Sequence, residues 1–270
     1  MIDPRLLQAV GDFLLPRADQ DRPALIGIAG SQGSGKSTLA AELARLYGGV
    51  ALSLDDVYLT KAERVRLASR LHPLFETRGP PLTHDLGLLD RVLDALSSAQ
   101  ECSLTPLPSF DKLADDRKPQ SEWLVYVGRP RFIFLEGWCL GAEPEPDMRL
   151  ASPVNRMEAT QDLNAIWRTA ANEALKTNYA ALRSRLDGLV FMKAPGFERV
   201  LDWRCQQEAG LMGQASVDEV TRERLAGFIE RFERLTRWML EGGIKADLEI
   251  TLDDRRHAVA IKTEEAISDP

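Results

Sequence analysis

The sequence predicts an α/β fold in which helices cover both faces of a parallel β-sheet. Short apolar runs alternate with amphipathic helical segments along the chain, and this alternation is typical of such a sheet. The 270 residues suit one large α/β domain, so we expect a single domain over residues 1–270. Glycines and prolines separate the apolar runs and set the limits of each element.

The pattern of the first half of the chain predicts four helices and two strands. The expected helices are 5–15, 36–47, 61–71 and 85–96, and the expected strands are 24–29 and 50–54. The polar segment 105–120 has four prolines in or near it, which exclude a long helix.

The second half predicts strands and helices of the same kind. The expected strands are 123–127, 131–135, 189–192 and 248–252, and the expected helices are 157–186, 197–212 and 217–239. The helix over 157–186 is expected because apolar residues recur there at helical spacing. Three prolines make 142–153 a loop, and the later arginines 231, 234 and 237 are expected on a solvated helix face.

The strongest chemical signal is a glycine-rich loop between the first strand and the helix after it. Residues 30–37 fit GxxxxGK[ST] at every fixed position, in the strand-to-helix context that this motif requires. Glycines let successive N–H groups point at phosphate oxygens, Lys36 reaches the β- and γ-phosphates, and the Ser37 hydroxyl ligates Mg²⁺. The expected nucleotide-binding residues are Gly30, Ser31, Gln32, Gly33, Ser34, Gly35, Lys36, Ser37 and Thr38. We therefore expect a P-loop NTPase-type sheet that uses ATP and Mg²⁺.

The rest of the sequence favours a small-molecule phosphotransferase among P-loop proteins. A GTPase would carry an Asn-Lys-x-Asp motif, but no asparagine in this chain is followed by lysine. Two acids, Asp55 and Asp56, follow the second strand, where a carboxylate can accept the proton of an attacking hydroxyl. Glu136 ends the strand Phe-Ile-Phe-Leu-Glu and is expected to hold Mg²⁺ through water.

Several further runs resemble one kinase family. Leu-Ser-Leu-Asp-Asp-Val-Tyr-Leu at 52–59 is similar to the Ser-x-Asp-x-Phe-Tyr segment of uridine kinase and phosphoribulokinase relatives. Four further runs resemble segments of D-glycerate 3-kinases. The segments are RG.PGTHD, matched within 72–85, P.YDKS, matched at 108–112, EGW.LG, matched within 134–141, and WR.QQE, matched at 203–208. These matches span residues 27–208 in the family's order. The chain departs from the pattern at Leu82, where glycine is usual, at Phe110, where tyrosine is usual, and over 113–117.

The resemblance implies a P-loop kinase that transfers phosphate to a primary hydroxyl of a small acid such as D-glycerate. It implies that Asp55 takes the proton of the acceptor hydroxyl and that Arg204 belongs to a lid over the γ-phosphate, within residues 196–225. Acceptor-binding residues are expected in insertions over about 60–120, where a cation must meet the acceptor carboxylate. The candidates are Asp56, Tyr58, Arg78, His84, Asp85, Lys112 and Arg117. A kinase of a nucleoside, pantothenate or a sugar phosphate, and a nucleotide-dependent switch, remain alternatives.

Charge and cysteine content limit the partners. The net charge of −7 argues against a nucleic-acid binder, whose binding surface would be basic. No run approaches the ~18 uninterrupted apolar residues of a membrane-spanning helix, so no membrane partner is expected. The three cysteines form no CxxC pair, and the N-terminal residues lack the order of a secretory signal, which indicates a reducing, cytoplasmic compartment. We expect a monomer.

Overall fold

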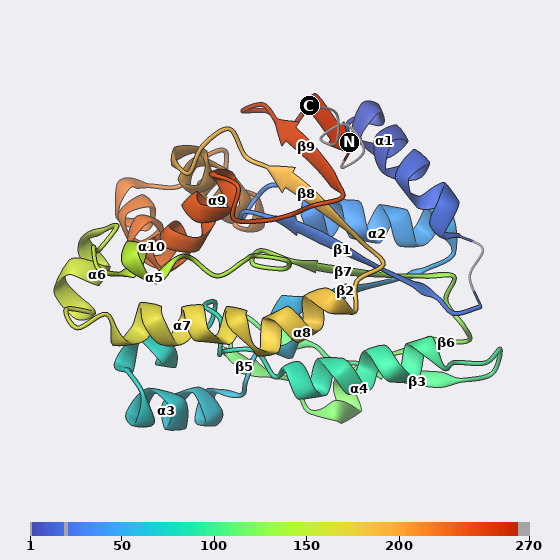
Figure 1. Ribbon diagram of the computed structural model, residues 1–270, viewed down its shortest axis with the longest axis horizontal. Helices are drawn as coiled ribbons and strands as arrows, with labels where there is room; N and C mark the ends of the chain where they lie inside the picture. Colours follow the sequence, from blue (N-terminus) through green and yellow to red (C-terminus); the bar gives the residue numbers. More distant parts are fainter. Residues whose placement is uncertain (1, 19–20, 264–270) are drawn as a thin grey trace.

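The computed structural model describes residues 2–18 and 21–263, and six strands within these ranges form the central sheet (Figure 1). The strand order is β10-β9-β8-β1-β7-β2. The pairs along the sheet are parallel except β10 with β9, which is antiparallel. The bounds are β1 (Ala24–Gly30), β2 (Val50–Ser53), β7 (Phe132–Gly137), β8 (Gly188–Lys193), β9 (Leu248–Leu252) and β10 (Ala258–Thr263). The predicted fold class is confirmed.

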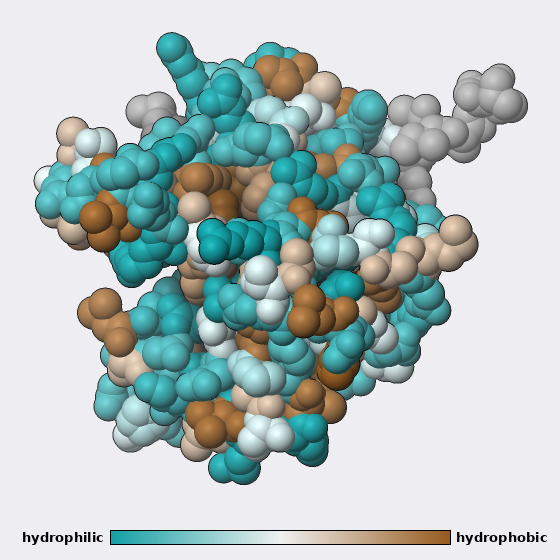
Figure 2. Space-filling view, turned by 90° about the vertical axis from the view of Figure 1, so that its left-hand side faces the viewer, coloured by the Kyte–Doolittle hydropathy of each residue, from teal (hydrophilic) through white to brown (hydrophobic). Residues whose placement is uncertain are grey.

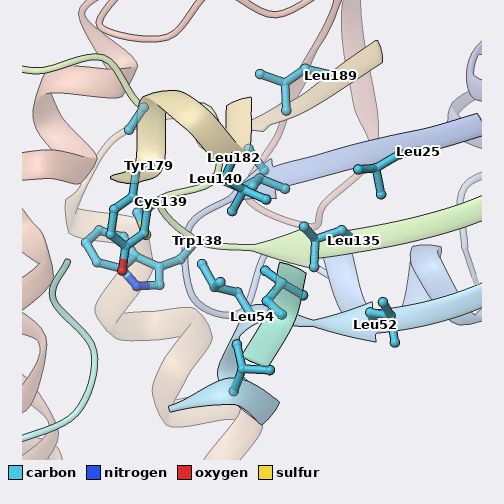
Figure 3. Packing of buried hydrophobic residues seen from close by; sticks show 14 of the residues in the cluster. Leu25, Leu52, Leu54, Leu135, Trp138, Cys139, Leu140, Tyr179, Leu182 and Leu189 are labelled. Atoms are coloured by element: carbon cyan, nitrogen blue, oxygen red, sulfur yellow. The ribbon is translucent and has the colours of Figure 1, made fainter. Parts of the chain in front are cut away.

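Helices pack on both faces of this sheet because side chains alternate along each buried strand. In β1, Ile26 and Ile28 point to a cluster with α1, α2 and α9, whereas Leu25 and Ala29 point to one with α4, α7, α8 and α10. Figure 3 shows part of the second cluster. The helices are α1 (Pro4–Leu14), α2 (Lys36–Tyr47), α3 (Lys61–Arg70), α4 (Leu86–Ser97), α5 (Asp147–Leu150), α6 (Arg156–Gln161), α7 (Ile166–Lys176), α8 (Asn178–Ser184), α9 (Glu198–Leu211) and α10 (Glu219–Leu240). Single turns of 3₁₀-helix are η1 (Leu15–Arg17), η2 (Leu54–Val57), η3 (Pro73–Glu76) and η4 (Gln120–Glu122).

Two small antiparallel sheets lie outside the central sheet. β3 (Leu104–Leu107) pairs with β6 (Leu124–Val127), and β4 (Phe110–Asp111) pairs with β5 (Asp116–Arg117). The strand expected over 123–127 is therefore present, but it does not join the parallel sheet. The segment 105–120 contains no long helix, as predicted. The strands β4 and β5 within it were not predicted from the sequence.

The single long helix expected over 157–186 is wrong, because the chain there forms α6, α7 and α8. The break after α6 is made by Asp162, which is buried. Its carboxylate accepts hydrogen bonds from the backbone N–H groups of Trp167 and Arg168, at 2.9 and 3.2 Å, and so caps the start of α7. Ala165 adopts the left-handed conformation just before α7, at φ 58°. A second break falls at Thr177, between α7 and α8.

The expected solvated arginine face on α10 is wrong at Arg234. Its side chain is buried and bonds to Glu158 at 2.6 and 2.8 Å and to Glu145 at 3.2 Å. These acids lie 76 and 89 residues before Arg234, so the pattern of residues along the helix does not reveal them. Arg237 bonds to Glu233, four residues before it on the same helix, at 2.8 Å.

The surface is mainly hydrophilic on the side that lies at the left of Figure 1. Figure 2 shows this face, with apolar residues in small groups and a hollow between an upper and a lower part. Among the described residues, no helix combines the length and apolar character needed to cross a membrane.

Candidate active site

The phosphate loop lies at the carboxyl end of β1, in the middle of the sheet. β1 ends at Gly30 and α2 begins at Lys36, so the loop directs the N-terminus of α2 toward the site. The buried hydroxyls of Ser31 and Ser34 have no hydrogen-bond partner among the described residues. Gly33 is left-handed, at φ 75°, and a Cβ there would lie 2.7 Å from Cβ of Trp203. A cradle of N–H groups with unpaired hydroxyls fits the oxygens of bound phosphates.

Glu136 links the loop to the neighbouring strands. Its Oε1 accepts hydrogen bonds from the hydroxyls of Ser37, at 2.7 Å, and Ser53, at 2.8 Å. Its Oε2 lies 3.6 Å from Nζ of Lys36. Ser37 and Glu136 thus offer oxygen ligands at the place where Mg²⁺ would meet the phosphates, and Mg²⁺ is commonly bound by one or two such ligands and phosphate oxygens. Sequence reasoning missed Ser53, although it is the serine of the Ser-x-Asp run.

Asp55 and Asp56 lie on η2, at the end of β2, and have different surroundings. Oδ1 of Asp55 accepts a hydrogen bond from the Tyr58 hydroxyl at 3.0 Å, and Oδ2 accepts one from Nζ of Lys112 at 2.9 Å. Burial raises the pKa of Asp55, but the charges of Lys112 and Lys36 outweigh it and hold the pKa at about 2. Asp55 is therefore an ionised carboxylate next to two cations, one of them the lysine of the phosphate loop.

Asp56 instead bonds to the backbone. Its Oδ1 accepts the N–H of Phe110 at 3.2 Å. Burial, and to a lesser extent the charge of Asp55, raises its pKa to about 6 against the effect of this hydrogen bond. It also lines a cavity of about 130 Å³ beside β2, α4 and the small sheet formed by β3 and β6. Of the two acids, Asp55 is the one whose pKa is lowered by the charge of Lys36 in the phosphate loop.

Replacing Asp56 with asparagine is expected to stabilise the protein at pH 8. The pKa of Asp56 is about 6 in the folded protein and ordinarily 3.8, so its contribution to folding is fully present below pH 3.8 and is lost as pH rises through 6. Asparagine keeps an oxygen for the N–H of Phe110 but carries no charge. Since one pKa unit corresponds to about 1.4 kcal/mol, the gain at pH 8 is at most about 3 kcal/mol.

Urea unfolding of Asp56→Asn and wild type at pH 4 and pH 8 measures this effect. Asp55→Asn is the matched control with the opposite sign. Its lowered pKa contributes stability above pH 3.8, and that stability is lost as pH falls through 2, so this variant is expected to be less stable at pH 8. Equal free energies of unfolding for Asp56→Asn and wild type at pH 8 would contradict the assignment of the raised pKa.

His84 is buried beside these acids and is held by two tyrosines. Its ring stacks on Tyr58 with centroids 4.5 Å apart, and its Nδ1 bonds to the Tyr179 hydroxyl. Burial lowers the pKa of His84 to about 4, which keeps the ring neutral.

The backbone conformation at Leu82 explains why the family pattern has glycine at this position. It has a left-handed backbone, at φ 81°, in the position where the pattern has glycine. Sequence reasoning missed Tyr179, since it lies on a helical apolar stripe and resembles a core residue. Figure 3 shows Tyr179, Cys139 and Trp138 grouped past the carboxyl end of β7.

The three candidate cations gather around the segment from β4 to β5. Arg78 bonds to Asp115, and its guanidinium carbon lies 5.4 Å from the ring centroid of Phe110. Lys112 bonds to Asp55, as described above. Nη1 of Arg117 lies 3.0 Å from Oδ2 of Asp85, whose other oxygen caps α4. Of the three, Lys112 contacts the carboxylate of Asp55, whereas Arg78 and Arg117 are paired with other acids of this region.

The expected lid arginine directly follows Trp203, which packs against Gly33 of the phosphate loop. Arg204 lies on α9 and bonds to Gln207 at 3.1 Å and to Glu208 at 2.9 Å, both on the same helix. Its role over the γ-phosphate stays a prediction.

The fold and the phosphate loop define this protein as a P-loop kinase, and comparisons with known proteins agree. No family model matches the sequence. The chain is 31% identical over 267 residues to uncharacterized kinase mug58 of Schizosaccharomyces pombe, with 90% of this chain and 92% of the relative covered. D-glycerate 3-kinase from Cryptococcus neoformans var. grubii serotype A has the same fold, with a TM-score of 0.76, 24% identity, and 96% and 99% of the two chains covered. The YGR205w protein superposes with a TM-score of 0.69 at 26% identity, over 96% and 98% of the chains.

The chain belongs to the same family of P-loop kinases as uncharacterized kinase mug58. The resemblance found in its sequence motifs is thereby confirmed at the level of the family.

Proposed function

We propose that this kinase transfers the γ-phosphoryl group of ATP, with Mg²⁺, to a hydroxyl of a small hydroxy acid, with D-glycerate as the first candidate. The observation that carries the proposal is the position of Lys112 beside Asp55, with Arg78 in contact with the backbone of Lys112. Nζ of Lys112 lies 2.9 Å from Asp55, and Nη2 of Arg78 lies 3.5 Å from the Lys112 carbonyl oxygen. A carboxylate that binds these cations would bring a hydroxyl one or two carbons away close to Asp55.

In this proposal the side chains have separate tasks. The phosphate loop and Lys36 hold the triphosphate, Ser37 and Glu136 hold Mg²⁺, and Asp55 accepts the hydroxyl proton as phosphate is transferred. Arg78 and Lys112 bind the acceptor carboxylate. Nε2 of the neutral His84 has no hydrogen-bond partner among the described residues and would bond to a hydroxyl of the acceptor. Support for these tasks comes from the contacts described above and from the family.

ATP turnover with a panel of acceptors tests the proposal. The panel contains D-glycerate, L-glycerate and glycerol, which lacks the carboxylate, together with pantothenate, a nucleoside and a sugar phosphate. We expect turnover that depends on D-glycerate and falls strongly with glycerol. Turnover that depends on another member assigns a different acceptor, and ATP hydrolysis that no acceptor changes would contradict the kinase proposal for a small hydroxy acid.

Arg78→Ala is expected to raise the KM for glycerate much more than the KM for ATP. The acceptor carboxylate would lose a bidentate partner, at a cost of ~2–4 kcal/mol in kcat/KM. The fold should survive, because Asp115 keeps its 2.7 Å contact with the buried Arg64. Arg78→Lys should lose less, since an ammonium acts only as a point charge.

Steady-state kinetics with each substrate varied in turn measures the two KM values. Arg66→Ala, which removes an exposed arginine from α3, is the control for loss of one positive charge. An unchanged KM for glycerate in Arg78→Ala would remove Arg78 from the acceptor site.

A further inference from the structure

The outer side of the phosphate loop rests on two residues from the far end of the chain. Trp203 of α9 packs closely against Gly33, since a Cβ added to Gly33 would lie only 2.7 Å from the Cβ of Trp203. Arg256, in the turn between β9 and β10, donates a hydrogen bond from Nε to the Gly33 carbonyl oxygen at 2.5 Å. The loop is thus held from outside by two elements.

The Arg256 guanidinium uses two of its N–H groups and one of its flat faces at once. Besides the bond to Gly33, its Nη1 donates to Oε1 of Gln206 on α9 at 3.0 Å, and its carbon lies 5.0 Å from the centroid of the Trp203 ring. The Trp203 indole N–H donates in turn to the Asp254 carbonyl oxygen at 2.9 Å. A planar, forked cation fits this arrangement, whereas a lysine ammonium has no flat face to stack.

The backbone at Arg256 is unusual as well. Its φ of 67° is left-handed, a conformation that residues other than glycine rarely adopt. The turn is held by Asp253, whose carboxylate accepts the N–H groups of Arg255 and His257 at 2.9 and 2.8 Å. A glycine would fit this position with less strain, so the side chain of Arg256 has a role that outweighs the backbone preference.

The contact with Gly33 has a direct consequence for phosphate binding. The Gly33 carbonyl and the Ser34 N–H belong to one planar trans peptide and so point in opposite directions. With the carbonyl held outward by Arg256, the Ser34 N–H points inward, where it makes a long bond, 3.3 Å, to the Ser31 carbonyl oxygen. Rotation of this peptide would turn an oxygen, in place of an N–H, toward the phosphates.

We propose that Arg256 is a positioning residue of the phosphate loop, which fixes the Gly33–Ser34 peptide so that its N–H faces bound phosphate. In this proposal it acts through the loop and not through a contact with substrate. Loss of the Arg256 side chain therefore weakens nucleotide binding and leaves binding of the acceptor unchanged.

Arg256→Gly separates this role from a purely structural one. Glycine accepts the left-handed backbone, so the melting temperature is expected to stay the same or to rise. The Kd for ADP with Mg²⁺, measured by calorimetry, is expected to rise roughly 10- to 100-fold, as for loss of one hydrogen bond from a charged group. In steady-state kinetics the KM for ATP rises, and the KM for the acceptor that the panel identifies does not.

Two variants are the controls. Arg255→Ala removes an equal charge from the same turn and is expected to keep the wild-type Kd for ADP. Arg256→Lys keeps the charge without the fork and should bind ADP as weakly as Arg256→Gly. The proposal is overturned by an unchanged Kd in folded Arg256→Gly, by equal weakening in Arg255→Ala, or by full recovery in Arg256→Lys. None of these outcomes depends on the identity of the acceptor.

Discussion

Replacing Lys36 with alanine is expected to reduce phosphoryl transfer by ~10³-fold or more, the largest effect of any substitution considered. The γ-phosphate would lose its main point charge as negative charge shifts in the transition state. Glu136 would also lose its cation, at 3.6 Å, and Asp55 would lose one of the two charges that hold its pKa at about 2.

Measurement of kcat at saturating ATP and acceptor checks this result. Lys245→Ala, which removes a lysine whose side chain is 79% exposed, is the control for loss of a positive charge. Turnover of Lys36→Ala close to that of the wild type would contradict the role given to the phosphate loop.

The second large effect is expected for Asp55→Asn. This variant should lower kcat by ~10²-fold or more and leave the affinity for ATP largely intact, because the amide keeps the shape of the side chain but accepts no proton. The amide oxygen can still accept the Tyr58 hydroxyl, whereas the ion pair with Lys112 is lost.

The pH profile separates the two neighbouring acids. With a pKa of about 2, Asp55 stays ionised throughout the range in which the enzyme is assayed, so it gives no acidic limb near neutrality. An acidic limb near pH 6, together with a larger loss of kcat in Asp56→Asn than in Asp55→Asn, would transfer the role of base to Asp56.

Local sequence patterns predicted the parts of this molecule that depend on local physics. The bounds of α2 and β9 agree with their predicted ranges, because an amphipathic run closed by glycines specifies the helix and an alternation of apolar and polar residues specifies the strand. Glu136 was found for the same reason, since it directly ends an apolar strand.

Interactions between residues distant in sequence account for what the patterns missed. The break at Asp162 depends on a buried carboxylate, and the role of Tyr179 depends on His84, which lies 95 residues before it. Arg256 follows the last core strand as one of two adjacent arginines, and the pattern does not say which of them turns back to Gly33.

The sequence separation between Gly33 and Arg256, 223 residues, also bears on how the protein is made. A ribosome adds roughly 5–20 residues per second, so the phosphate loop emerges early and waits at least ten seconds or so for the arginine that holds it. Its neighbours β7 and β8 are likewise synthesised about 100 residues or more after β1. During synthesis the nascent loop lacks these supports, and competence to bind nucleotide arises late, after the turn that carries Arg256 has left the exit tunnel.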